Sequence, residues 1–145
     1  MYKHLLLPTD GSPLSEGSVR RGIQFARQVG AKVTGFYAMP EFRVMAYTLA
    51  MIDDGRTPFE NQAMERAEAV LAFVQTIAQQ EGVLCDTFMI TSDIPHKAII
   101  KAARDRECDL IVMASHGRRG VEGFLVGSET TRVLTHSKIP VLVHR

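Results

Sequence analysis

The chain has 145 residues, of which 46% are hydrophobic and 23% are charged, and its formal net charge is +1. This composition is typical of a globular protein, and we expect one domain, residues 1–145, with a sizeable core. The near-neutral charge argues against a nucleic-acid partner. No apolar run approaches the ~20 residues of a membrane span, and the first one is too short for a signal sequence, so we expect a cytoplasmic protein without membrane contact.

The first part of the chain alternates between short apolar runs and helical patterns. Residues 5–7 form the first expected strand, which ends in a turn. Ser12 is the expected N-cap of the following helix, with Pro13 in its first position and Gly30 as its stop. The second strand spans residues 32–38.

The middle of the chain contains its least regular segment. Residues 41–56 include a short apolar stretch and fit either a variable packing segment or a specific partner site. Thr57 then opens a capping box that begins the clearest helix, and Gly82 ends this helix. The third strand spans residues 83–91, and Asp93 is the expected cap of the next helix.

The last part of the chain completes the alternation. A strand at 110–114 precedes a loop and a helix at 129–137 capped by Ser128, and the fifth strand is 141–143. Five strands and four helices predict an α/β fold, a single doubly wound domain whose parallel sheet carries helices on both faces. The apolar runs of the first, fourth and fifth strands predict that both faces of each are covered.

The loop after the fourth strand contains four glycines within eleven positions, at 117, 120, 123 and 127. A strand that leads through such a loop into a helix N-terminus fits a phosphate cradle, and it fits a merely flexible loop equally well. The loop contains neither a Walker A motif nor Gly-x-Gly-x-x-Gly. Arg118 and Arg119 are either phosphate ligands or solvated side chains, and His116 is either a phosphate donor or a packing residue.

Asp10 follows the first strand and should lie at the same end of the sheet as this loop. It could accept a hydrogen bond from a ribose hydroxyl, or it could serve the turn as a helix cap. No carboxylate pair, nucleophile–histidine spacing or His/Cys cluster indicates a specific chemical step. Cys85 and Cys108 are isolated, which predicts reduced thiols.

Several segments together resemble the universal stress protein family over essentially the whole chain. They are Leu5-Leu6-Leu7-Pro8-Thr9-Asp10-Gly11-Ser12, Asp93-Ile94-Pro95-His96, the run from Asp109 to Arg118, Gly127-Ser128, and Ile139-Pro140-Val141-Leu142-Val143. The nucleotide-binding branch of that family has the pattern Gly, two residues, Gly, nine residues, Gly, then Ser or Thr. In this chain those positions are Ala114, Gly117, Gly127 and Ser128, so the spacing is kept and the first glycine is replaced.

The resemblance implies a site for ATP or AMP, with any Mg²⁺ bound through the phosphates. The implied phosphate-binding groups are Gly117, Gly127, Ser128 and the amides of Glu129 and Thr130. Pro8, Thr9 and Asp10 would face the ribose and adenine, the backbone of Ala38 would meet the adenine ring, and Met113 would flank the nucleotide. The remaining residues of the expected nucleotide-binding site are Ala114, His116, Arg118, Arg119 and Gly120.

Ala114 is the departure from the family pattern. A left-handed conformation there would cost alanine about 1 kcal/mol, whereas an extended conformation would be comfortable. Because four apolar strand residues precede Ala114, we expect it to be extended and ATP binding to be weakened or unchanged.

The family also implies a homodimer through Val141, Leu142 and Val143, and a regulatory or protective role under stress. The alternatives are a slow ATP-hydrolysing enzyme and a nucleotide-free dimeric interaction module.

Overall fold

The computed structural model describes residues 1–41, 58–116 and 126–145. Its strands are β1 (His4–Pro8), β2 (Lys32–Met39), β3 (Cys85–Thr91), β4 (Leu110–Ala114) and β5 (Val141–His144). Its helices are α1 (Pro13–Val29), α3 (Pro58–Glu81), α4 (Pro95–Asp105) and α5 (Ser128–His136). No helix in these ranges is long and apolar enough to cross a membrane. The expected Thr57 cap and almost all of the irregular segment at 41–56 lie outside the described residues.

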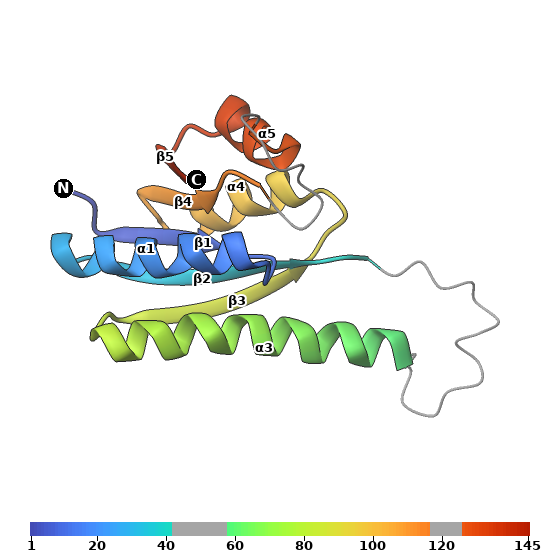
Figure 1. The fold of residues 1–145 in the computed structure, drawn as a ribbon. Coiled ribbons are helices and arrows are strands. Elements are labelled where there is room, and N and C mark those ends of the chain that lie inside the picture. The colour runs from blue at the N-terminus through green and yellow to red at the C-terminus, as the bar shows by residue number, and fades with distance from the viewer. Residues whose placement is uncertain (42–57, 117–125) are drawn as a thin grey trace.

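The five strands form one parallel sheet in the order β3-β2-β1-β4-β5. The chain winds from β1 outward to β3 and then returns to the other side of β1 to add β4 and β5. Helices α1 and α3 pack together on one face of the sheet, and α4 and α5 pack together on the other (Figure 1). The predicted doubly wound α/β fold is therefore confirmed.

The two central strands carry the core. Every residue of β1 and β4 is buried, as their continuous apolar runs predict. Leu5 and Leu7 pack toward α1 and α3, while Leu6 packs toward α4. The expectation that both faces of the strand are covered is wrong for β5, which is the edge strand. Its Leu142, the register partner of Val112, is 45% exposed, because the helix layer that buries Val112 does not reach the sheet edge.

Most of the predicted helix ends are observed. The Ser12 hydroxyl accepts a hydrogen bond from the Ser15 N–H, Pro13 begins α1, and Gly30 ends it in a left-handed conformation with φ of 71°. Gly82 follows α3 with φ of 67°. Each stop uses the positive φ that glycine adopts at little cost.

Two predicted N-caps are wrong. Helix α5 is capped by Gly127 and not by Ser128, because the Gly127 carbonyl already accepts the helical hydrogen bond from the Thr131 N–H at 2.9 Å. Helix α4 is capped by Ile94 without a side-chain hydrogen bond. Asp93 accepts instead from the Glu41 N–H at 2.9 Å, so its carboxylate holds the segment after β2.

Candidate functional site

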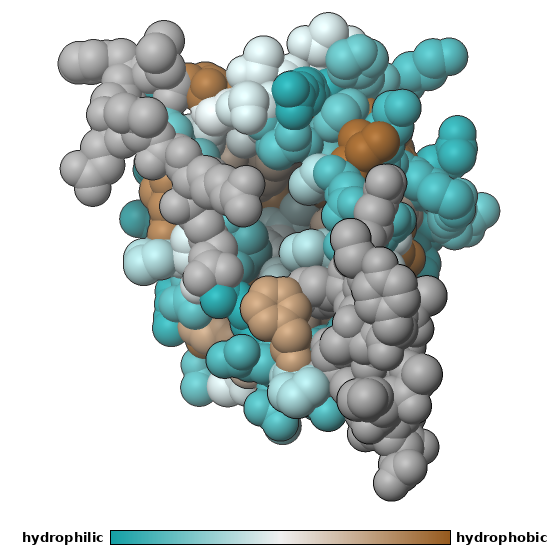
Figure 2. All heavy atoms as spheres, turned by 90° about the vertical axis from the view of Figure 1, so that its right-hand side faces the viewer, coloured by the Kyte–Doolittle hydropathy of each residue, from teal (hydrophilic) through white to brown (hydrophobic). Residues whose placement is uncertain are grey.

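A cavity of about 690 Å³ opens at the carboxyl ends of β1 and β4. These adjacent strands are the point where the winding of the sheet reverses, which is where open α/β sheets take their ligands. Figure 2 looks onto this end of the molecule, where a recess is bordered by largely hydrophilic residues. The volume suits a small molecule.

Eleven residues of the predicted nucleotide site line this one cavity. They are Pro8, Thr9, Asp10, Ala38, Met113, Ala114, His116, Gly127, Ser128, Glu129 and Thr130. Their placement together is observed, while their contact with a nucleotide stays a prediction. Gly117, Arg118, Arg119 and Gly120 lie outside the described residues.

The sequence interpretation missed eight lining residues, namely Ser15, Phe36, Tyr37, Pro40, Asp93, Pro95, Ile99 and Arg132. Two signals could have found some of them. Pro40 and Asp93 follow β2 and β3, and the ends of parallel strands meet at one edge of the sheet. Arg132 lies one turn after Ser128, so it shares a face of α5 with the first turn.

The loop after β1 is held by its own short polar side chains. The Asp10 carboxylate accepts from the Ser12 N–H at 3.0 Å, and the Ser15 hydroxyl donates to Thr9 Oγ1 at 2.8 Å. Gly11 has φ of 76°, and a Cβ there would lie 2.6 Å from Val70 Cγ2. The turn role of Asp10 is thus observed, and its ligand role stays a prediction.

The end of β4 is joined closely to the start of α5. The Gly127 N–H donates to the Ser115 carbonyl at 2.6 Å, and the Thr130 hydroxyl donates to the Ala114 carbonyl at 2.9 Å. A Cβ on Gly127 would lie 3.1 Å from the Ser115 carbonyl oxygen and 3.3 Å from His116 Cα. Close packing, and not the backbone angles, therefore favours glycine at position 127.

Ala114 is the last residue of β4 and has no left-handed conformation. The expectation that it is extended is confirmed. Ala114 is buried and lines the cavity at the position where the family pattern has a glycine.

The start of α5 and His116 provide free polar groups at the cavity. Among the described residues, the N–H groups of Ser128, Glu129 and Thr130 have no hydrogen-bond acceptor, as is normal in a first helical turn. Such a turn favours an anion. The Nδ1 atom of His116 lies 2.8 Å from Ser115 Oγ, whereas its buried Nε2 has no partner within the described part of the chain. A buried polar atom without a partner is uncommon in proteins.

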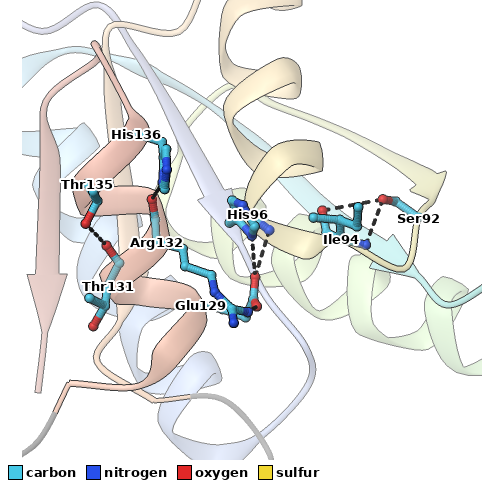
Figure 3. A network of polar contacts seen from close by, with 8 residues as sticks. All are labelled: Ser92, Ile94, His96, Glu129, Thr131, Arg132, Thr135 and His136. Atoms are coloured by element: carbon cyan, nitrogen blue, oxygen red, sulfur yellow. Dashed lines mark hydrogen bonds and ion pairs between the residues drawn. The ribbon is translucent and has the colours of Figure 1, made fainter.

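Glu129 links the two helices beside the cavity. Its carboxylate accepts from the His96 N–H at 2.9 Å and lies 3.1 Å from His96 Nδ1, and it also pairs with Arg132 (Figure 3). Burial alone would raise the pKa of Glu129. The hydrogen bonds from Arg132 and His96 outweigh this effect and hold the pKa below its ordinary value. Glu129 is therefore an anion at neutral pH.

The thiols lie away from this cavity and are free. Burial raises the pKa of Cys108 to about 12 and also raises the pKa of Cys85. Such thiols stay protonated and unreactive at neutral pH. The described residues contain no group of three or more His, Cys, Asp or Glu side chains placed to hold a metal ion.

The sheet order and the cavity at its reversal point define a doubly wound α/β domain. The chain belongs to the universal stress protein family, whose family model matches residues 1–145. The family resemblance seen in the sequence is thereby confirmed.

Individual relatives agree with this assignment. Universal stress proteins MJ0531 and MJ0577 of Methanocaldococcus jannaschii are 29% and 26% identical, each over 99% of this chain and over 82% and 94% of their own lengths. The solved structure of MJ0577 has a TM-score of 0.80 at 27% identity, covering 99% of this chain and 95% of its own.

Two further solved relatives contain adenine nucleotides. A universal stress protein in complex with cAMP has a TM-score of 0.75 at 23% identity, covering 99% of this chain and 97% of its own. A universal stress protein of Archaeoglobus fulgidus in complex with dAMP has a TM-score of 0.70 at 18% identity, covering 100% of this chain and 98% of its own. At these identities the two structures establish the shared fold.

Proposed function

We propose that this chain binds an adenine nucleotide, ATP or AMP, in the cavity at the ends of β1 and β4. The observation that carries this proposal is the first turn of α5, whose N–H groups lie at the cavity wall and have no acceptor among the described residues. His116 lines the same wall, and its buried Nε2 has no partner in that part of the chain. These groups suit the phosphates. The apolar wall made by Pro8, Ala38 and Met113 suits the adenine ring.

Asp10 follows β1 and lines the same cavity. It is the proposed acceptor for ribose hydroxyls. Any Mg²⁺ would reach the site through the phosphates. The cAMP and dAMP complexes of fold relatives support an adenine nucleotide over other phosphate ligands.

The biological role we propose is regulatory or protective in the cytoplasm under stress, with the bound nucleotide as the signal. Family membership supports this role.

Isothermal titration with ATP, AMP and GTP tests the binding proposal, together with identification of any nucleotide released by denaturing the purified protein. We expect ATP or AMP to bind and GTP to bind at least about tenfold more weakly, a difference of about 1.4 kcal/mol. Asp10→Ala should weaken binding of ATP and AMP, while Asp86→Asn, at the opposite end of the sheet in β3, should not. Absence of binding even at millimolar ATP and AMP would refute the proposal.

We also propose a homodimer formed through the edge strand β5. Its Val141, Leu142 and Val143 are only partly buried, and an edge strand presents unpaired backbone groups that a second copy could satisfy. Light scattering should report a dimer at micromolar concentration, and Leu142→Lys should shift it toward monomer. A wild-type monomer under these conditions would refute the dimer without affecting the nucleotide proposal.

A further inference from the structure

The last residues of β2 extend past the end of β1 and form one wall of the cavity. The register of β1 with β2 ends at Pro8 and Phe36, whereas β2 continues to Met39. Ala38 and Pro40, on either side of Met39, both line the cavity. This part of β2 therefore has a neighbouring strand on one side only, namely β3, with which it stays in register as far as Met39.

The backbone of Ala38 lies along the open side of this segment. On the β1 side, the Phe36 carbonyl accepts from the Thr9 N–H at 2.9 Å. On the β3 side, the Met39 carbonyl accepts from the Ser92 N–H at 2.8 Å. Because the backbone groups of a strand alternate between its two edges, the N–H and C=O of Ala38 lie on the β1 side, beyond the point where β1 ends.

Asp93 holds the end of β2 where its pairing with β3 stops. By the same alternation, the next backbone donor on the β3 side after Met39 is the Glu41 N–H. Strand β3 ends at Thr91, and the Asp93 carboxylate accepts from this N–H at 2.9 Å. A side chain thereby takes the place of a neighbouring strand, and it anchors the residue that follows the cavity residue Pro40.

Asp93 is itself placed by a tight turn between β3 and α4. The Ser92 hydroxyl accepts from the Ile94 N–H at 3.1 Å, so this bond spans Asp93 (Figure 3). Helix α4 begins directly afterwards, at Pro95. The carboxylate therefore projects from a turn that is held on both sides, which makes it a firm attachment point for the end of β2.

We propose that Asp93 is a positioning residue for the nucleotide base, which it aligns through Glu41 and the end of β2. This inference rests on the proposed nucleotide function, which sets the adenine ring against the wall that contains Ala38. Adenine carries an acceptor, N1, beside a donor, its N6 amine, and these match the N–H and C=O of Ala38. Hypoxanthine carries N1–H and O6 in the same places, so its pattern is reversed. Selection of the base therefore depends on how firmly the end of β2 is held.

The test compares the affinities for ATP and for ITP, whose base is hypoxanthine, by isothermal titration. We expect the ATP-to-ITP affinity ratio to fall about threefold to tenfold in Asp93→Ala, which removes the acceptor for the Glu41 N–H. Asparagine keeps an acceptor oxygen without the charge, so Asp93→Asn should stay within about twofold of the wild type. An equal fall in both variants would assign the effect to charge and overturn the inference.

A second pair of variants removes the same hydrogen bond from the donor side. Glu41→Pro deletes the N–H and should lower the ratio as Asp93→Ala does, whereas Glu41→Ala keeps the N–H and is the matched control. Asp93→Ala added to Glu41→Pro should cause little further change, because both act on one bond. If Asp93 instead acted by touching the ligand, Glu41→Pro would leave the ratio unchanged, and that result overturns the inference.

Thermal melts monitored by circular dichroism establish that each variant is folded, and should Asp93→Ala not fold, the two Glu41 variants decide the question. A fall in the ratio confined to Asp93→Ala and Glu41→Pro supports the inference. An equal loss of ATP and ITP affinity in these variants, or a wild type that binds both nucleotides equally, overturns it while ATP binding stands. A wild-type protein that binds neither ATP nor AMP contradicts the proposed function itself.

Discussion

The Thr130 hydroxyl donates a 2.9 Å hydrogen bond to the carbonyl of Ala114, although the two residues are sixteen positions apart in the chain. Both residues are buried, and the bond ties the first turn of α5 to the last residue of β4. The Gly127 N–H adds a second link to the neighbouring Ser115 carbonyl. These two bonds fix the position of the helix start relative to the sheet and thereby shape this side of the cavity.

Thr130→Val should therefore affect both stability and binding. Valine keeps the shape of threonine but leaves the buried Ala114 carbonyl without this donor, which should lower the free energy of unfolding by about 1–2 kcal/mol. ATP affinity should fall because the helix start is less firmly held. Urea denaturation and calorimetric titration measure the two effects. Thr131→Val, one residue away and exposed, is the matched control and should change neither quantity.

Ala114 offers a direct test of the altered family pattern. Because it is extended, Ala114→Gly should change ATP affinity by no more than about threefold and lower the unfolding free energy by about 0.5–1 kcal/mol. Ala114→Leu would place a large side chain at a buried position beside the cavity and should reduce ATP affinity at least about tenfold. A gain of more than about tenfold in Ala114→Gly, measured by titration, would show that the methyl group obstructs the ligand.

Much of the fold could be predicted from local sequence signals. Ser12, Pro13, Gly30 and Gly82 mark helix ends through backbone preferences that act within a few residues, and the structure confirms all four. The cap of α4 could not be found in this way. Its donor, the His96 N–H, is satisfied by Glu129 from another helix thirty-three positions away, and no local pattern reports such a contact.

The candidate site likewise has one part that the sequence predicts and another that depends on contacts between distant residues. The end-of-strand rule predicts that Asp10 and the region after Ala114 lie at one edge of the sheet, and they line the same cavity. The preference for glycine at position 127 comes from the close approach of the Ser115 and His116 backbone atoms. Only the folded structure reveals this contact. Arg132 was missed although its spacing of one turn from Ser128 places it on the same face of α5 as the first turn.

Gly35 is a position where a single methyl group should destabilise the sheet. It is buried in β2, where a Cβ would lie 2.9 Å from Val74 Cγ1 and 3.2 Å from Thr87 Cγ2. Gly35→Ala should lower the free energy of unfolding by about 1–3 kcal/mol through overpacking between the sheet and α3. Urea denaturation measures the change. Gly17→Ala in α1, where a Cβ meets nothing within 4 Å, is the control and should be neutral or stabilising.

His4 should make stability depend on pH. It is buried at the start of β1, with Nε2 2.6 Å from Thr34 Oγ1. Burial and the nearby positive charge of Lys32 lower its pKa below the ordinary 6.5, although Asp109 opposes the shift.

The unfolded chain therefore takes up a proton at His4 below about pH 6.5, while the folded chain resists it, so the free energy of unfolding falls as pH decreases through this range. The loss levels off below the folded pKa, where both states are protonated. His4→Gln should lower stability at pH 8 but flatten the decline between about pH 7 and pH 5 relative to the wild type. Urea denaturation at several pH values measures both curves, with His136→Gln as the exposed histidine control. Parallel curves for the wild type and His4→Gln would assign the pH dependence to other groups.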